Sequence, residues 1–156
     1  MKLNRMLVIS AAILVTLLVG AFALNALAPA KDLKLKVKWR PPTYTLGTPL
    51  PTTWIAEIFF APIRDLNEID TTTLKLEYTY TPSATPYLIS GNPPRLAVPF
   101  HGYDVINAIM SETTHMTPGT YQIWLTISGN LKAEYGGNPF SGEGAINLVV
   151  PDPSPP

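Results

Sequence analysis

The chain has 156 residues and no formal net charge, because eleven Lys and Arg residues balance eleven Asp and Glu residues. Charged residues make up 14% and hydrophobic residues 46% of the chain, which excludes a disordered polyelectrolyte and a broadly basic nucleic-acid-binding protein. The absence of cysteine excludes a disulfide framework and a Cys-ligated zinc site, while seventeen prolines and ten glycines disfavour long helices.

Residues 1–30 have the pattern of a targeting segment. Two basic residues precede an uninterrupted apolar stretch, Met6–Leu24, which is long enough for a helix to cross a membrane. Small residues at positions 21–23 and 28–30 are instead typical of signal-peptidase sites. We therefore leave open whether the segment is a cleaved signal peptide or a retained anchor, and expect residues 31–150 to be an exported β-sandwich domain.

The segment Leu33–Arg40 alternates apolar and cationic residues, which is typical of a half-buried strand. Residues 31–40 hold five cations and one anion, whereas residues 41–156 hold four cations and ten anions. The lysines either protect an edge of the chain's own sheet or belong to a strand that completes a neighbouring subunit's sheet. The residues of this predicted donor interface are Leu33, Lys34, Leu35, Lys36, Val37, Lys38 and Trp39.

A proline-rich connector, residues 41–53, separates this strand from the rest of the domain. One short helix is predicted at Val105–Met110 with Asp104 as its N-terminal cap, and residues 151–156 form a proline-rich tail. No alternation of strands with helices is present, so the pattern predicts an all-β antiparallel sandwich of seven to eight strands. The further predicted strands are 54–60, 73–80, 87–89, 96–100, 120–128, 131–135 and 145–150.

Few residues have the spacing of a catalytic site. His101 and His115 are the only histidines, and their separation matches no metal-ligand or acid–base arrangement. Ser141 lacks the Gly-x-Ser-x-Gly frame of a nucleophile elbow and is expected in a hairpin turn. We therefore predict that the chain is not an enzyme, with no catalytic residues and no organic cofactor.

Calcium is the one cofactor for which the sequence offers candidate ligands. Asp65, Asn67 and Asp70 place three oxygen ligands in one loop, fewer than the roughly six to eight oxygens that the ion takes. The two carboxylates equally suit Asx turns, in which they accept hydrogen bonds from nearby backbone.

Apolar residues on otherwise polar strand faces predict a covered surface. These residues are Ile55, Phe59, Trp124 and Val149. They favour assembly with other copies of the chain or with another cell-surface protein. The alternative is that the exposed aromatic rings form a sugar-stacking platform centred on Trp124.

Four segments resemble an immunoglobulin-like module that recurs in secreted archaeal and bacterial surface proteins. They are Ile58–Phe60, Asp65–Leu76, Leu96–Phe100 and Gly119–Gly129. The resemblance covers about residues 54–150, and it implies a fold and a compartment rather than an activity. In plan alone, the chain is also similar to archaeal surface filament subunits that assemble by strand donation.

The function expected from these observations is that of a non-enzymatic exported subunit, structural or assembling, at the cell surface, where it forms an extracellular filament through its first strand. Two alternatives stay open, a carbohydrate-binding or adhesion module and an accessory subunit anchored by its apolar leader. We expect a homo-oligomer or a cell-surface protein partner, no nucleic acid, and membrane contact only through residues 6–24.

Overall fold

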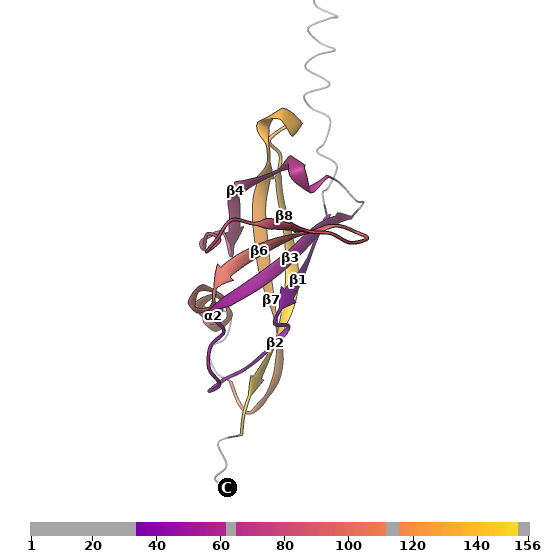
Figure 1. Ribbon diagram of the computed structural model, residues 1–156. Coiled ribbons are helices and arrows are strands. Elements are labelled where there is room, and N and C mark those ends of the chain that lie inside the picture. Colours follow the sequence, from indigo (N-terminus) through magenta and orange to yellow (C-terminus); the bar gives the residue numbers. More distant parts are fainter. Residues whose placement is uncertain (1–33, 62–64, 112–115, 153–156) are drawn as a thin grey trace, which may run out of the picture. The chain divides into compact units, whose positions relative to one another are not determined.

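Within the part of the chain that the structure describes, the alternating segments pair into eight strands, with one α-helix and two short 3-10 helices between them (Figure 1). The computed structural model describes residues 34–61, 65–111 and 116–152, so the predicted leader, Leu33 and His115 lie outside the described residues. The elements are β1 (Lys34–Arg40), β2 (Thr43–Thr45), β3 (Thr53–Ala61), η1 (Leu66–Glu68), β4 (Ile69–Leu76), β5 (Tyr87–Ile89), β6 (Arg95–His101), α2 (Gly102–Ser111), β7 (Gly119–Leu131), η2 (Ala133–Tyr135) and β8 (Pro139–Val150).

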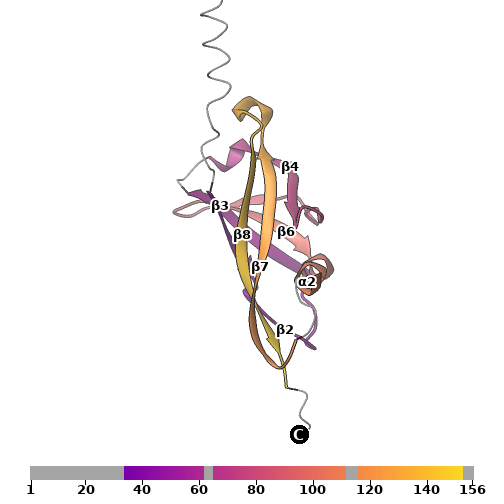
Figure 2. The same cartoon turned by 180° about the vertical axis from the view of Figure 1, so that it is seen from behind.

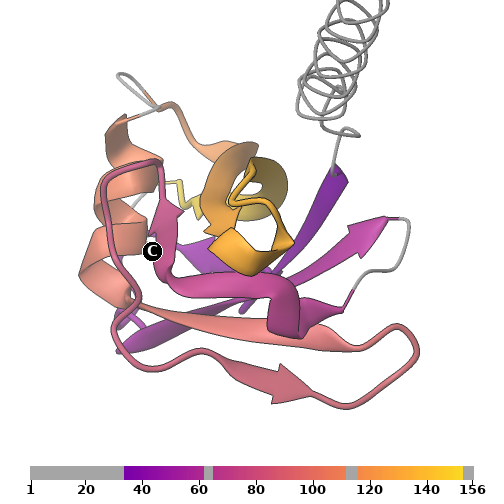
Figure 3. The same ribbon diagram turned by 90° about the horizontal axis from the view of Figure 1, so that it is seen from above.

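The strands follow one hydrogen-bonded path in the order β4-β7-β8-β1-β3-β6-β5, and β2 joins the path through β8. β1 is antiparallel to β3, and β7 is antiparallel to β8 over twelve successive pairs without a register shift. Figures 1 and 3 show the β4-β7-β8 part lying across the β1-β3-β6-β5 part, so the path forms two layers. The predicted all-β class with one short helix is confirmed.

The space between the layers is filled by one apolar core. Phe60 of β3 meets Phe140 of β8 edge to face, with ring centroids 5.3 Å apart. The ring centroids of Trp39 on β1 and Phe100 on β6 lie 6.2 Å apart. The core therefore joins strands that are distant in the chain, and α2 closes it with Val105, Ala108 and Ile109.

β1 lies unusually close to β8. A Cβ atom added to Gly144 would lie 2.8 Å from the Val37 carbonyl oxygen, and one added to Gly142 would overlap the Leu35 carbonyl oxygen. The Trp39 indole Nε1–H donates to the Gly144 carbonyl oxygen at 3.0 Å. The glycines of β8 thus provide the room in which the first strand enters the core.

The predicted connector, residues 41–53, contains a strand that the sequence analysis missed. Pro41 and Pro42 end β1, and the next three residues form β2, which is parallel to β8 rather than antiparallel as expected. The Leu46 N–H donates to the Val149 carbonyl oxygen, and the Asn147 N–H donates to the Pro42 carbonyl oxygen, each at 2.9 Å. Three residues are too few to show an alternation of apolar and polar side chains, so the sequence pattern could not predict this strand.

Two further strands differ from the prediction. β4 ends at Leu76 rather than at Tyr80, because Glu77 and Tyr78 take positive φ angles of 47° and 56°. The strand predicted at 131–135 is wrong: β7 ends at Leu131 and a 3-10 turn follows.

The remaining two corrections concern Ser141 and α2. Ser141 lies in β8 and not in a hairpin turn, because the turn between β7 and β8 precedes it. The helix begins at Gly102, so Asp104 lies in its first turn rather than at its cap. Among the described residues, no helix combines the length and apolar character needed to span a bilayer; the apolar leader is not among them.

Candidate functional site

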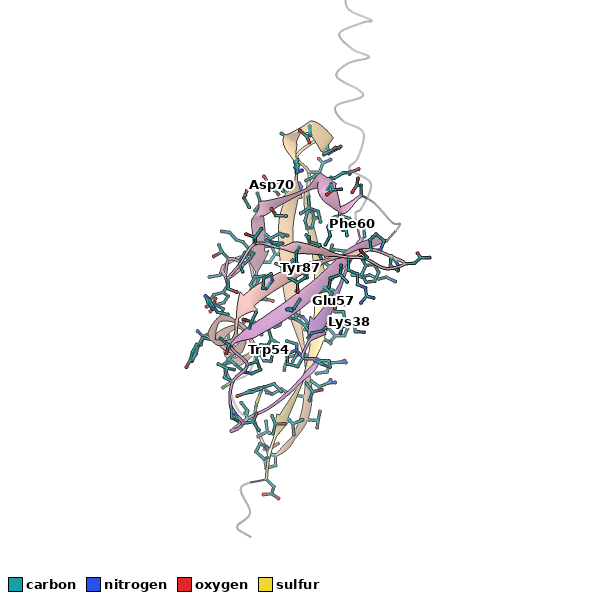
Figure 4. All side chains as sticks on the ribbon, in the orientation of Figure 1. Lys38, Trp54, Glu57, Phe60, Asp70 and Tyr87 are labelled. Atoms are coloured by element: carbon teal, nitrogen blue, oxygen red, sulfur yellow. The ribbon has the colours of Figure 1, made fainter. Side chains whose placement is uncertain are left out.

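The outward side of β1, β3, β6 and β5 carries a cationic surface that also includes apolar side chains, and we call it the basic face. In the strand register, Lys38 lies opposite Glu57, Glu57 opposite Ala97, and Ala97 opposite Tyr87. Figure 4 shows Lys38, Glu57 and Tyr87 along one diagonal of this layer. The basic face consists of Lys36, Lys38, Arg40, Ile55, Glu57, Phe59, Arg95 and Tyr87.

Glu57 is the buried anion of this face, and its side chain is only 3% exposed. Its Oε1 pairs with the Arg40 Nε on β1, and its Oε2 lies 2.5 Å from the Arg95 Nη1 on β6. A buried carboxylate requires such partners because transfer out of water is costly without them. The carboxylate therefore ties the central strand of the layer to both of its neighbours.

Two lysines of the basic face have no anionic partner in the described part of the chain. The structure records no ion pair for Lys38, and the Lys36 ammonium stands 6.0 Å from the centre of the Phe59 ring. The face contains four cations and one anion, a net charge of +3. Apart from this face and Lys34, the described residues hold two cations and eight anions, a net charge of −6.

A second surface, the outward side of the β7-β8 hairpin, carries Trp124. This residue is 55% exposed, whereas the other two tryptophans are buried. The residue opposite it on β8 is Ala145, and the pairs on either side are Gln122 with Asn147 and Thr126 with Glu143. We call these six residues the Trp124 face; Figure 2 shows the hairpin that presents it.

Two of the three candidate calcium ligands, Asp65 and Asp70, use a carboxylate oxygen in a local turn. Asp65 Oδ1 accepts the Asn67 N–H at 2.9 Å and caps η1. Asp70 Oδ1 accepts the hydroxyl of Thr72 at 2.6 Å and its N–H at 3.1 Å. Across the described ranges, no group of three or more His, Cys, Asp or Glu residues is placed to hold a metal ion.

The hydrogen bonds from Thr72, first from its hydroxyl and then from its N–H, lower the pKa of Asp70 from its ordinary value of 3.8. The shift favours the ionised form in the folded chain. Its contribution to stability is therefore present at neutral pH and is lost as the pH falls below 3.8 and through the lowered value.

The structure separates the predicted interface residues. Leu35 and Trp39 are buried in the core of their own chain, and Val37 is half-buried against it. Ile55 and Phe59 are half-buried on the basic face, beside Lys36 and Lys38, while Trp124 lies on the other layer. The side chain of Lys34 and all of Leu33 lie outside the described residues.

The sequence analysis did not identify Glu57, Arg95 or Tyr87 as members of a surface. Glu57 stood out only as a charge between two outward apolar residues of one strand. Its arginine partners come from other strands, so only the pairing of β1, β3 and β6 brings the ions together.

Comparisons with protein-family models, with curated proteins and with solved structures return no match for this chain. The function is therefore inferred from the chemistry of the two strand faces.

Proposed function

We propose that the chain is a non-enzymatic, exported, immunoglobulin-like module that acts as a structural subunit at the cell surface. Copies assemble through the basic face of one molecule and the acidic surface of the next. The observation that carries this proposal is the basic face itself, on which two lysines without an anionic partner among the described residues lie beside half-buried Ile55 and Phe59.

The strand order supports the immunoglobulin-like part of the proposal. The first strand pairs with the second long strand and then, after Pro41-Pro42, its continuation β2 runs parallel to the last strand. The strands of the layers β1-β3-β6-β5 and β4-β7-β8 follow the chain in the same order as the strands of the two sheets of a constant-type immunoglobulin sandwich.

A tyrosine near the start of β7 adds to this. The Tyr121 hydroxyl donates to the Thr117 carbonyl oxygen at 2.8 Å, as in the tyrosine corner of immunoglobulin-like domains. Ile123 follows two residues later and is buried where antibody domains carry the second cysteine of their disulfide. An apolar core replaces the disulfide in this chain, which has no cysteine.

Charge complementarity makes a second copy the favoured partner of the basic face. A surface of net charge +3 and a remainder of net charge −6 attract each other between molecules at low ionic strength. Since the two surfaces differ, the contact is head to tail, and such contacts build open filaments unless the rotation closes a ring.

The ends of the described unit suit a linear array. Lys34 pairs with Ser141 near the start of β8, while Val150 ends that strand (Figure 2). Nine residues of strand separate these points, roughly 30 Å at the usual rise. The chain therefore enters and leaves the described unit at opposite ends of β8.

The proposal includes a second route of assembly, in which a copy donates the strand Leu33–Arg40 to its neighbour. β1 is paired within its own chain, between β3 and β8, so donation would have to exchange identical strands between copies. Association through the basic face needs no such exchange, because its cations already point outward.

The test is the assembly state of the full chain in a detergent that disperses its apolar leader. Light scattering measures the molar mass, and electron microscopy shows whether filaments form. We expect the wild type to assemble at about 0.05 M salt and to dissociate near 1 M, where charges are screened beyond about 3 Å. The double variant Lys36→Glu/Lys38→Glu should stay monomeric at both salt concentrations.

The matched control is Lys75→Glu/Lys132→Glu, which makes the same change in net charge at two exposed lysines outside the basic face. It should assemble like the wild type. A wild type that is monomeric at every concentration, or equal loss of assembly in both double variants, would overturn the proposal.

A further inference from the structure

The Trp124 face shares no residue with the basic face and differs from it in chemistry. Trp124 is half-exposed at the centre of a strand pair, which leaves its ring available to a ligand. Ala145, the residue directly opposite, is too small to cover the ring. One flat aromatic surface is therefore left accessible.

Three neutral polar side chains and one carboxylate, that of Glu143, surround the ring. Gln122 and Thr126 flank Trp124 along β7, and Asn147 lies beyond Ala145 on β8, opposite Gln122. The structure records no hydrogen bond from the side-chain amides of Gln122 or Asn147 to any described residue. A primary amide both donates and accepts, so the two groups match hydroxyls, which do the same.

The hairpin presents these groups on an extended, regular surface. β7 and β8 pair over twelve residues without a shift, while β4 pairs with β7 only as far as Leu76 opposite Ile127. Of the strands described, none lies beside β7 at Trp124 on the side away from β8. Beyond Leu76, Glu77 still lies beside Thr126, because its N–H donates to the Thr126 carbonyl oxygen and its Oε1 accepts the Thr126 N–H. A ligand would therefore approach Trp124 from above the sheet.

The charges of the face decide against other ligand classes. Its one ionised member is Glu143, which repels phosphate, sulfate and acidic peptides. A protein interface core needs several contiguous apolar residues, and only Trp124 and Ala145 are apolar here. The negatively charged face of an indole attracts the C–H groups on one side of a pyranose ring, whose hydroxyls remain free to bind the amides.

We infer that the Trp124 face is a binding site for a neutral sugar, in which a pyranose stacks on Trp124 and its hydroxyls bind Gln122 and Asn147. The site shares no residue with the basic face.

The test uses the full chain in a detergent without a sugar headgroup. A neutral glycan array identifies ligands, which are then titrated as soluble oligosaccharides by calorimetry and tryptophan fluorescence. Trp124 reports the binding because Trp39 and Trp54 are 1% and 0% exposed. We expect Trp124→Ala to weaken binding at least about tenfold and Trp124→Phe to weaken it less, since a ring remains.

The matched control is Tyr103→Ala, which removes a 76% exposed aromatic ring of α2 and should leave binding unchanged. Gln122→Ala should weaken binding without altering the assembly state. No bound glycan on the array, or binding that Trp124→Ala leaves intact, overturns the inference. Loss of assembly in Trp124→Ala without any glycan binding overturns it too, and assigns the face to a protein contact.

Discussion

At the scale of single residues, Glu57 shows how a surface position becomes part of the interior. Strand alternation places it outward between Ile55 and Phe59, yet Arg40 and Arg95 cover it until its side chain is 3% exposed. The two arginines stay partly exposed, at 54% and 31%, so they keep much of their hydration while the carboxylate loses its own. The stability of the arrangement therefore depends most on the anion.

We expect Glu57→Gln to lower the free energy of unfolding by about 1–3 kcal/mol, because a neutral amide replaces two charge-assisted contacts and cannot accept both arginines. Urea denaturation of the full chain measures the change. Glu143→Gln, at an exposed position of β8, is the control and should change stability by less than about 0.5 kcal/mol. Equal effects of the two substitutions would contradict the role of the ion pairs.

At the scale of elements, the contact of β1 with β8 depends on Gly142 and Gly144. The carbonyl groups of Leu35 and Val37 occupy the space where side-chain Cβ atoms would lie. These are backbone atoms of a strand held on its other side by β3, so they cannot move away without disturbing that pairing.

Gly142→Ala should therefore cost about 1–3 kcal/mol of stability through overpacking, measured by thermal and urea unfolding. Gly91→Ala is the same substitution in an exposed loop, where the new Cβ meets nothing closer than 3.4 Å. It should leave stability within about 0.5 kcal/mol of the wild type. A dimer formed by Gly142→Ala alone would indicate that the displaced β1 exchanges between copies.

The elements also show which strands the sequence pattern can predict. β1, β3 and β7 were predicted because long alternation sets a strand and its buried side. The apparent strand through Tyr80 failed because its alternation continues through a turn, which depends on the backbone of Glu77 and Tyr78.

Long-range pairing limited the prediction of the sites. β2 and the ion pairs of Glu57 depend on β8 and β6, which local pattern does not connect to them. Trp124 was identified because its outward position follows from β7 alone.

At the scale of the whole molecule, one core joins both layers, and no described strand pair forms a separate apolar unit. Trp39 and Trp54 report on β1 and β3, while Leu125 of β7 packs from the opposite layer and is 0% exposed. In a domain of this size, such a core predicts a single cooperative unfolding transition.

Leu125→Ala should therefore destabilise the domain by about 2–5 kcal/mol and shift the fluorescence transition of Trp39 and Trp54, on the other layer, as much as the hydrogen-exchange protection of β7. Gln122→Ala, on the outward side of the same strand, should move neither probe appreciably. If the tryptophan transition stayed in place while β7 lost protection, the two layers would unfold separately. Binding of a second copy to the basic face would then stabilise only one layer. With a shared core, the same contact also stabilises the hairpin that carries Trp124.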